Sequence, residues 1–337
     1  MSSEVMGKGI VFVKENVLVK GIVLAGRIVL SALVLLSCSV VLLAGKTEEP
    51  EPKTGALGTF VSIVPLSYFV ERIGGEQVLV QVLVQPGQDP HIYEPTPRQM
   101  VALNEADILF VTGLPFEEQI LGKVQSTNPH LRVVYTDRGV ERRMLEEHRH
   151  GDEEHSHDGL EHGNRDSEGH DHHVSGEPDP HIWLGPEEIG IQARNIFKGL
   201  VEVEPDLKEF FRENFDSFLE DLDAVDRRLT ELLAPYRGKS FFVFHPSFGY
   251  FADAYGLVQV PIEIEGKSPT PKQIEALIAK ARKEDVHIIF VQPQFDKRSG
   301  DAIAGAINGT VITIDPLETD VLKNLEDIAQ KIEGSLH

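Results

Sequence analysis

Four residues in this chain carry side chains that bind metals and also stand directly beside a proline. They are His91, His181, His245 and Asp315, in the pairs Pro90-His91, Pro180-His181, His245-Pro246 and Asp315-Pro316. Proline fixes φ and therefore stiffens the backbone next to each of these side chains. Three imidazoles with one carboxylate or one open position form a ligand set that suits zinc. The residue types therefore predict a metal centre.

Two of the histidines lie in a motif that occurs twice. The sequence DPHIY at residues 89–93 is nearly repeated as DPHIW at residues 179–183. An aromatic residue, Tyr93 or Trp183, follows the histidine by two positions in each copy. We expect these rings to wall the site and exclude water.

Three of the four residues follow predicted strands. His245 and Asp315 end the apolar runs KSFFVFH and VITID, and His91 follows a strand and the turn QPGQDP. In α/β folds, ligands bind at the carboxyl ends of the strands. Two residues come from the first half of the chain and two from the second, so a site between two lobes would bring them together.

Short apolar runs and amphipathic stretches alternate from residue 57 onward, which predicts parallel sheets flanked by helices. The expected strands cover residues 59–64, 78–83, 108–111, 133–135, 240–244, 258–262, 287–291 and 311–314. The expected helices cover residues 65–73, 96–105, 116–124, 185–201, 205–233, 271–283 and 321–334. Residues 205–233 would form a helix about 43 Å long, which is enough to span two lobes. The expected fold is α/β, with two lobes that each contain a mainly parallel four-stranded sheet and that are joined by this one long, rigid helix.

This pattern also sets the expected domain boundaries. We expect a signal or anchor segment at residues 1–45 and a tether at residues 46–56. An N-terminal α/β lobe (57–186), a connecting helical region (187–236) and a C-terminal α/β lobe (237–337) are expected to follow.

The amino terminus has the features of an export signal. Lys14, Lys20 and Arg27 precede an uncharged run over residues 28–44, and a basic region before an apolar core is typical of such signals. Cys38 follows Leu35-Leu36-Ser37, which resembles a bacterial lipobox and makes Cys38 a candidate for lipidation. An uncleaved anchor and an ordinary cleaved signal are the alternatives. All three place the body of the protein outside the cytoplasmic membrane, either attached to its outer face or in the periplasm.

Composition excludes other classes of partner and site. The formal net charge of −22 argues against nucleic acid as a partner, because phosphates would be repelled. Cys38 is the only cysteine of the 337 residues, so neither an intrachain disulfide nor a zinc site built from cysteines is possible.

Residues 146–175 form a His-rich acidic segment with almost nothing apolar to bury, and we expect a disordered loop there. It holds eight of the fourteen histidines, namely His148, His150, His155, His157, His162, His170, His172 and His173. Imidazoles and carboxylates at close quarters suit borderline divalent metals, so these histidines are candidate accessory ligands.

Other candidates are weaker. Glu94 is expected to be a cap or turn residue, and Glu263 and Glu265 are expected in a solvated loop, although both could approach the cleft. His130, His287 and His337 are expected to be structural or exposed. The aromatic residues Phe248, Tyr250 and Phe251 are expected in the core of the second lobe.

Six segments of the chain resemble the metal-binding solute-binding proteins of ABC transporters, and most closely the high-affinity zinc-uptake type. The segments are QPGQDPHIYEPTPRQ, DPHIWL, FVFHPSFGYFADAYG, PTPKQIEAL, FVQPQF and TIDPL, which occur in this order between Gln85 and Leu317. The resemblance implies two lobes around a metal cleft and a rigid connecting helix. It also implies that His91, His181 and His245 are ligands and that Asp315 matches an aspartate that is sometimes a fourth ligand.

The resemblance implies a monomeric, extracytoplasmic protein that captures Zn²⁺ and delivers it to an ABC permease, with zinc as transported ligand rather than catalytic cofactor. Zinc members carry histidine at the position of His245 and often carry a His-rich loop before the second ligand. Binding is expected to weaken below about pH 6 as the histidines protonate. The alternatives are a manganese receptor of the same family, a zinc buffer acting through the His-rich loop, and a zinc hydrolase. No motif in the sequence places a general base for a hydrolase.

Overall fold

The computed structural model describes residues 55–145, 177–263, 270–295 and 297–336. The expected export segment with Cys38, nearly all of the tether, the eight histidines of the His-rich segment, Glu265 and His337 lie outside these ranges. Within them, no helix combines the length and the apolar character that crossing a membrane requires.

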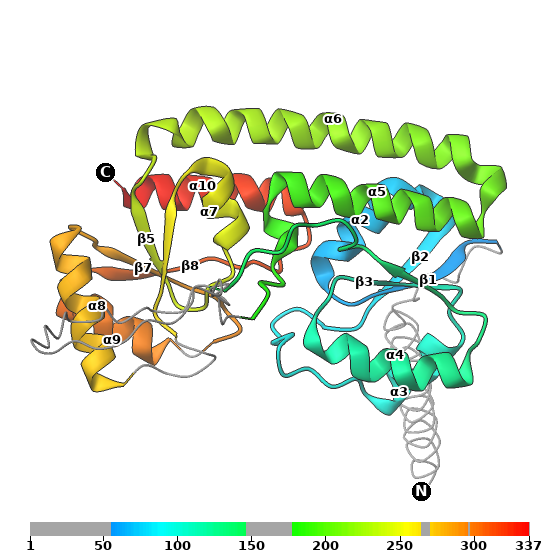
Figure 1. Ribbon diagram of the computed structural model, residues 1–337, viewed down its shortest axis with the longest axis horizontal. Helices are drawn as coiled ribbons and strands as arrows, with labels where there is room; N and C mark the ends of the chain where they lie inside the picture. Colours follow the sequence, from blue (N-terminus) through cyan, green and yellow to red (C-terminus); the bar gives the residue numbers. More distant parts are fainter. Residues whose placement is uncertain (1–54, 146–176, 264–269, 296, 337) are drawn as a thin grey trace, which may run out of the picture. The chain divides into compact units, whose positions relative to one another are not determined.

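The first lobe contains a four-stranded sheet in the order β2-β1-β3-β4, and every neighbouring pair is parallel. Its strands are β1 (Leu57–Val61), β2 (Val78–Val82), β3 (Ile108–Val111) and β4 (Arg132–Tyr135). Helices α2 and α5 cover one face of this sheet, while α3 and α4 lie on the other (Figure 1). These helices are α2 (Val64–Gly74), α3 (Pro97–Asn104), α4 (Pro115–Thr127) and α5 (Pro186–Val203). The 3₁₀ turns η1 (Gly75–Gln77) and η2 (Ile182–Leu184) precede β2 and α5.

The second lobe repeats this arrangement with the order β6-β5-β7-β8, again with parallel neighbours. Its strands are β5 (Ser240–Val243), β6 (Val258–Pro261), β7 (Ile288–Val291) and β8 (Thr310–Thr313). Its helices are α7 (Gly249–Tyr255), α8 (Pro271–Lys283), α9 (Arg298–Ala306) and α10 (Val321–Ser335). Two such sheets confirm the predicted fold class.

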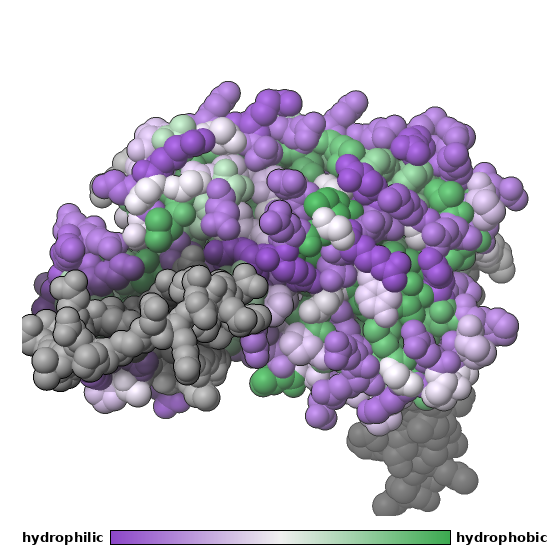
Figure 2. Space-filling view, in the orientation of Figure 1, coloured by the Kyte–Doolittle hydropathy of each residue, from purple (hydrophilic) through white to green (hydrophobic). Residues whose placement is uncertain are grey.

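The long helix α6 (Lys208–Leu233) spans both lobes (Figure 1). It follows the 3₁₀ turn η3 (Pro205–Leu207) and leads into η4 (Ala234–Tyr236). It contacts α2 and α5 of the first lobe and α7 and α10 of the second. Its buried residues recur at steps of three and four, as expected for one face of a helix, and they are Phe211, Phe215, Phe218, Leu222, Val225, Leu229 and Leu233. Figure 2 shows mainly hydrophilic residues on the outer side of α6. The predicted connecting helix is therefore present.

The expected strands and helices are all found, with small differences at their ends. Helices α7 and α9 were not given bounds by the sequence pattern. Residues Gly249–Tyr255 form only about two turns, which is too short to show an amphipathic period. The prediction that Phe248, Tyr250 and Phe251 belong to the core is confirmed, since all three are buried.

Substitution of Phe218 by alanine is expected to lower the free energy of unfolding by about 3–5 kcal/mol, because it leaves a cavity in packed surroundings. The Phe218 ring is fully buried, and its centroid lies 5.7 Å from that of Phe69 on α2. Urea unfolding measures the change. Glu220→Ala on the exposed side of α6 is the control, with an expected change below about 0.5 kcal/mol. A loss below about 1 kcal/mol for Phe218→Ala would contradict the packing role of α6.

Candidate metal site

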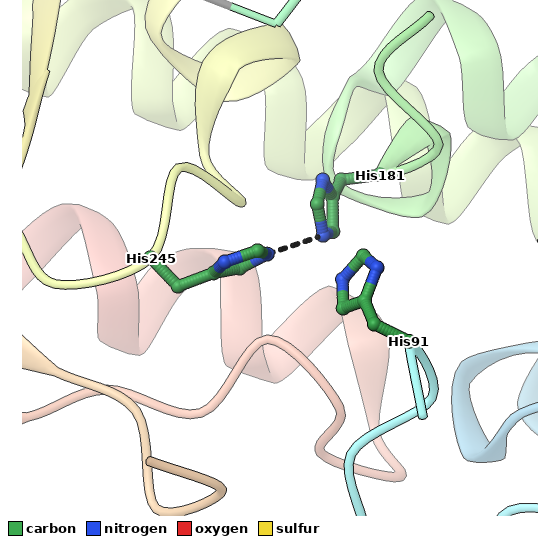
Figure 3. Close-up of side chains that lie close together, drawn as sticks. All are labelled: His91, His181 and His245. Atoms are coloured by element: carbon green, nitrogen blue, oxygen red, sulfur yellow. Dashed lines mark hydrogen bonds between the residues drawn. The ribbon is translucent and has the colours of Figure 1, made fainter. Parts of the chain in front are cut away.

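Three histidines that are far apart in the sequence converge between the two lobes (Figure 3). His91 lies in the loop after β2, His181 precedes η2, and His245 follows β5. One ring nitrogen from each histidine lies within 4.8 Å of the other two. The ring centroids are 4.7–5.3 Å apart. This spacing allows one metal ion to bind all three imidazoles.

Aspartate–proline turns fix the backbone at the first two histidines. The His91 N–H donates to Asp89 Oδ1 at 2.9 Å, and the His181 N–H donates to Asp179 Oδ1 at 2.9 Å. An aspartate that accepts from the backbone two residues later is a common turn device. The two copies of the Asp-Pro-His motif thus form the same local structure.

Asp179 also fixes the ring of His181. His181 Nδ1 lies 2.7 Å from Asp179 Oδ1, while Asp179 Oδ2 accepts from Arg143 Nη1 at 3.0 Å. Asp179 is completely buried. Burial acts to raise the pKa of this carboxyl, but His181 and Arg143 hold the pKa below its ordinary value. An ionised carboxylate only accepts hydrogen bonds, so Nδ1 of His181 carries the hydrogen and Nε2 presents a lone pair.

Glu263 plays the same role for His245. His245 Nδ1 lies 3.0 Å from Glu263 Oε1, and only 7% of the Glu263 surface is exposed. The expectation of a solvated loop is therefore wrong for Glu263, because its carboxylate turns inward to the imidazole. Carboxylate partners of this kind fix the tautomer and orientation of metal-binding histidines.

The two lone pairs meet at the centre of the site. His181 Nε2 and His245 Nε2 are 3.2 Å apart (dashed line in Figure 3). Because each Nδ1 donates its hydrogen to a carboxylate, each Nε2 presents a lone pair that can bind a cation. Two nitrogen ligands about 2.05 Å from a tetrahedral zinc ion would be roughly 3.3 Å apart. The observed separation fits this distance.

Burial keeps the three imidazoles neutral. Burial and, to a smaller extent, the neighbouring His245 lower the pKa of His91 to about 4. The pKa values of His181 and His245 are also below the ordinary value, chiefly because both side chains are buried. A metal therefore displaces few protons from these nitrogens at neutral pH.

Aromatic side chains wall the cavity around the histidines. Trp183 lines it with the edge of its ring against His181, at 5.3 Å between centroids, and its Nε1 donates to Pro316 O at 2.8 Å. Phe295 stacks on His245 at 4.8 Å. The expectation for Trp183 is thus met. Tyr93 instead packs against Phe116 in the core of the first lobe and does not line the cavity.

Asp315 does not join the group of ligand atoms around the three histidines. Its Oδ1 accepts from Leu317 N–H at 2.9 Å and from Gln294 Nε2 at 2.8 Å. The first of these bonds repeats the turn seen at Asp89 and Asp179. Metal ligation by Asp315 stays a prediction.

Of the remaining candidates that the structure describes, His130 and His287 are exposed, as expected, and Glu94 is exposed in the segment before α3. Sequence reasoning missed the roles of Asp179, Phe295 and Gln294. The repeated Asp-Pro-His motif was a usable signal for Asp179. Phe295 and Gln294 become recognisable only through their contacts across the cavity.

The chain is similar to known metal-binding proteins. The sequence model described as "Zinc-uptake complex component A periplasmic" (ZnuA) matches residues 60–334. The chain is 27% identical over 292 residues to the high-affinity zinc uptake system protein ZnuA of Bacillus subtilis (strain 168), and the match covers 83% of this chain and 82% of the relative. It is 29% identical over 240 residues to the manganese ABC transporter substrate-binding lipoprotein PsaA of Streptococcus pneumoniae, covering 69% of this chain and 71% of PsaA.

Two solved structures of ZnuA are similar to this chain. A crystal structure of ZnuA superposes with a TM-score of 0.73 and 35% identity, over 84% of this chain and 100% of that one. A ZnuA deletion mutant with zinc bound gives a TM-score of 0.72 and 35% identity, over 83% of this chain and 98% of that one. The chain therefore belongs to the ZnuA family of periplasmic zinc-uptake components.

Proposed function

We propose that this protein captures one Zn²⁺ ion between its lobes through His91, His181 and His245 and delivers it to an ABC permease. The observation that carries this proposal is the position of two ring nitrogens, Nε2 of His181 and Nε2 of His245, which lie 3.2 Å apart. Two buried carboxylates orient these rings, and His91 lies beside them. Zinc is the cargo of this site rather than a resident cofactor.

The ligand chemistry favours zinc over manganese. Three neutral imidazoles suit zinc, whereas manganese prefers carboxylate, carbonyl and water oxygens. Glu263 and Asp179, the carboxylates that contact the histidine rings, bind ring Nδ1 atoms instead. A manganese receptor is the second candidate function, because one relative is a manganese transporter protein. The three-imidazole ligand set disfavours this candidate.

The same contacts argue for binding rather than hydrolysis. A hydrolytic zinc needs a group that accepts a proton from its bound water. Asp179 and Glu263 are already hydrogen-bonded to imidazoles and, for Asp179, to Arg143 as well. We infer that the protein is a receptor and not an enzyme.

The protein would act outside the cytoplasmic membrane as a monomer. A lipid on Cys38 or an uncleaved anchor would hold it at the membrane. Residues 57–186 and 237–337 would form the two lobes, and residues 187–236 the connection. The His-rich segment would collect metal through many weak ligands, without fixing its geometry.

Removal of residues 146–175 is expected to leave one tight zinc site, because the three histidines lie outside this segment. Its flanks are adjacent, since Leu145 N–H donates to Glu177 O at 2.9 Å, so a short glycine linker can close the gap. Native mass spectrometry with zinc titration counts the ions. His91→Ala in the same background should abolish the tight site, and His130→Ala is the matched control on an exposed histidine. Loss of tight zinc on removal of the segment would instead indicate a buffer protein.

Asp179→Asn is expected to weaken zinc binding on the order of tenfold, because the imidazole of His181 loses the carboxylate that fixes its tautomer. Competition with a zinc chelator measures the change. Asp253→Asn is the matched control: Asp253 also accepts from Arg143, at 2.9 Å, and it is 62% exposed. Equal losses of zinc affinity in the two variants would show that the affinity depends on the contacts of Arg143 rather than on the tautomer of His181.

The pH dependence of zinc affinity should begin lower than the sequence alone predicts. Because burial lowers the pKa of His91 to about 4 and lowers those of His181 and His245, protons compete little with zinc above about pH 6. Affinity should be nearly constant from about pH 7.5 to 6 and should fall steeply as the pH approaches 4. Chelator competition across this range checks it. A tenfold loss between about pH 7.5 and 6 would show that the ligands titrate like exposed histidines.

A further inference from the structure

Gln294 is a polar residue in the wall of the metal cavity, and only one of the two polar groups of its side-chain amide forms a hydrogen bond to a described residue. It lies beyond β7 and lines the cavity together with the three histidines. Its Nε2 donates to Asp315 Oδ1 at 2.8 Å. Its Oε1 is buried and, among the described residues, accepts no hydrogen bond. Buried polar atoms are nearly always paired, so an unpaired oxygen beside a metal site requires an explanation.

Asp315 determines which way this amide faces. A carboxylate only accepts hydrogen bonds, so the NH₂ group of Gln294 must point to Asp315. The reverse orientation would place two acceptor oxygens against each other and is excluded by the hydrogen-bond chemistry. Oε1 is therefore held on the side of the amide away from Asp315.

The coordination shell has a place for an oxygen. Among the His, Cys, Asp and Glu side chains in the described part of the chain, the ligand atoms that lie within 4.8 Å of one another come from the three histidines, and no carboxylate is among them. Zinc is usually four-coordinate in proteins. Oδ1 of Asp315, the residue that the family resemblance suggests as a fourth ligand, already accepts from Gln294 and from Leu317 N–H.

We propose that Gln294 Oε1 is the fourth zinc ligand and that Asp315 is a positioning residue that acts through Gln294. An amide oxygen is uncharged, so the loaded site would keep the full charge of the ion. A neutral, weaker fourth ligand suits a protein that must release its cargo. This inference rests on the proposed function, since it assigns one more residue of the same zinc site.

The substitution Asp315→Asn separates the two roles of Asp315. Both side-chain bonds of Asp315 end on Oδ1, which the substitution retains, while the negative charge is lost. A positioning role should survive Asp315→Asn, whereas direct ligation by the carboxylate should not. The substitution Asp315→Ala removes both roles.

The experiment compares the purified full-length chain with Gln294→Leu, Asp315→Asn and Asp315→Ala. Zinc affinity is measured by chelator competition, and coordination is followed by the visible d–d absorption of bound Co²⁺. Gln294→Leu and Asp315→Ala should each weaken zinc binding on the order of tenfold and alter the Co²⁺ spectrum in the same way. Asp315→Asn should stay within about threefold of the wild type and keep its spectrum. The double variant Gln294→Leu/Asp315→Ala should be no weaker than Gln294→Leu alone.

Two outcomes would overturn the inference. If Asp315→Asn is as weak as Asp315→Ala, the charge of Asp315 acts directly on the metal. If Gln294→Leu keeps the affinity and spectrum of the wild type, water supplies the fourth ligand. Thermal melting of the metal-free variants verifies folding, and Asp315→Asn still separates positioning by Asp315 from direct ligation if Gln294→Leu is unstable. Failure of the wild type to bind zinc would instead contradict the proposed function itself.

Discussion

The buried hydrogen bond between Asp179 and His181 is the interaction on which the site depends. One carboxylate oxygen receives both the backbone N–H and the ring Nδ1 of His181, and the other oxygen pairs with Arg143. Arg143 also binds Asp253 on α7, while Tyr250 OH donates to the carbonyl of Asp179. The ligand loop of one lobe is thus fastened to a helix of the other. A single buried charge orients the imidazole and ties it to both lobes.

The same arrangement directs two ring nitrogens toward one point of the site. Asp179 and Glu263 both force the hydrogen onto Nδ1, so the Nε2 lone pairs of His181 and His245 face each other. Helix α6 packs on both lobes and limits how far they can separate. Its packing therefore helps to hold the ligand loops in place, and ligands held in place lower the entropic cost of binding.

Sequence reasoning identified the architecture and the three histidines, and the physical reasons are clear in each case. Apolar runs of four or five residues and the long stripe from Phe211 to Leu233 have periods that belong to strands and helices. Each histidine stands beside a proline, and His91 and His245 follow predicted strands. The resemblance to a known family linked these positions to one site, and the convergence of the rings agrees with it.

The contacts around the three histidines could not be predicted from the sequence, because they depend on packing between distant segments. Glu263 looks like a loop residue in sequence, yet its carboxylate turns toward His245, 18 positions earlier in the chain. Phe295 stacks on the same imidazole from 50 positions later. Tyr93 and Trp183 occupy equivalent positions in the repeated motif, but only Trp183 reaches the cavity. A motif therefore predicts the local turn, and the fold decides where the next side chain points.

The central claim is that three neutral imidazoles bind the transported ion. X-ray absorption spectroscopy at the zinc edge, on the full chain loaded with one equivalent of zinc, tests it most directly. We predict a four-coordinate ion with three imidazole nitrogens at about 2.0–2.1 Å and one oxygen ligand. A shell with fewer than three imidazoles, or a six-coordinate shell dominated by oxygen, would contradict the account.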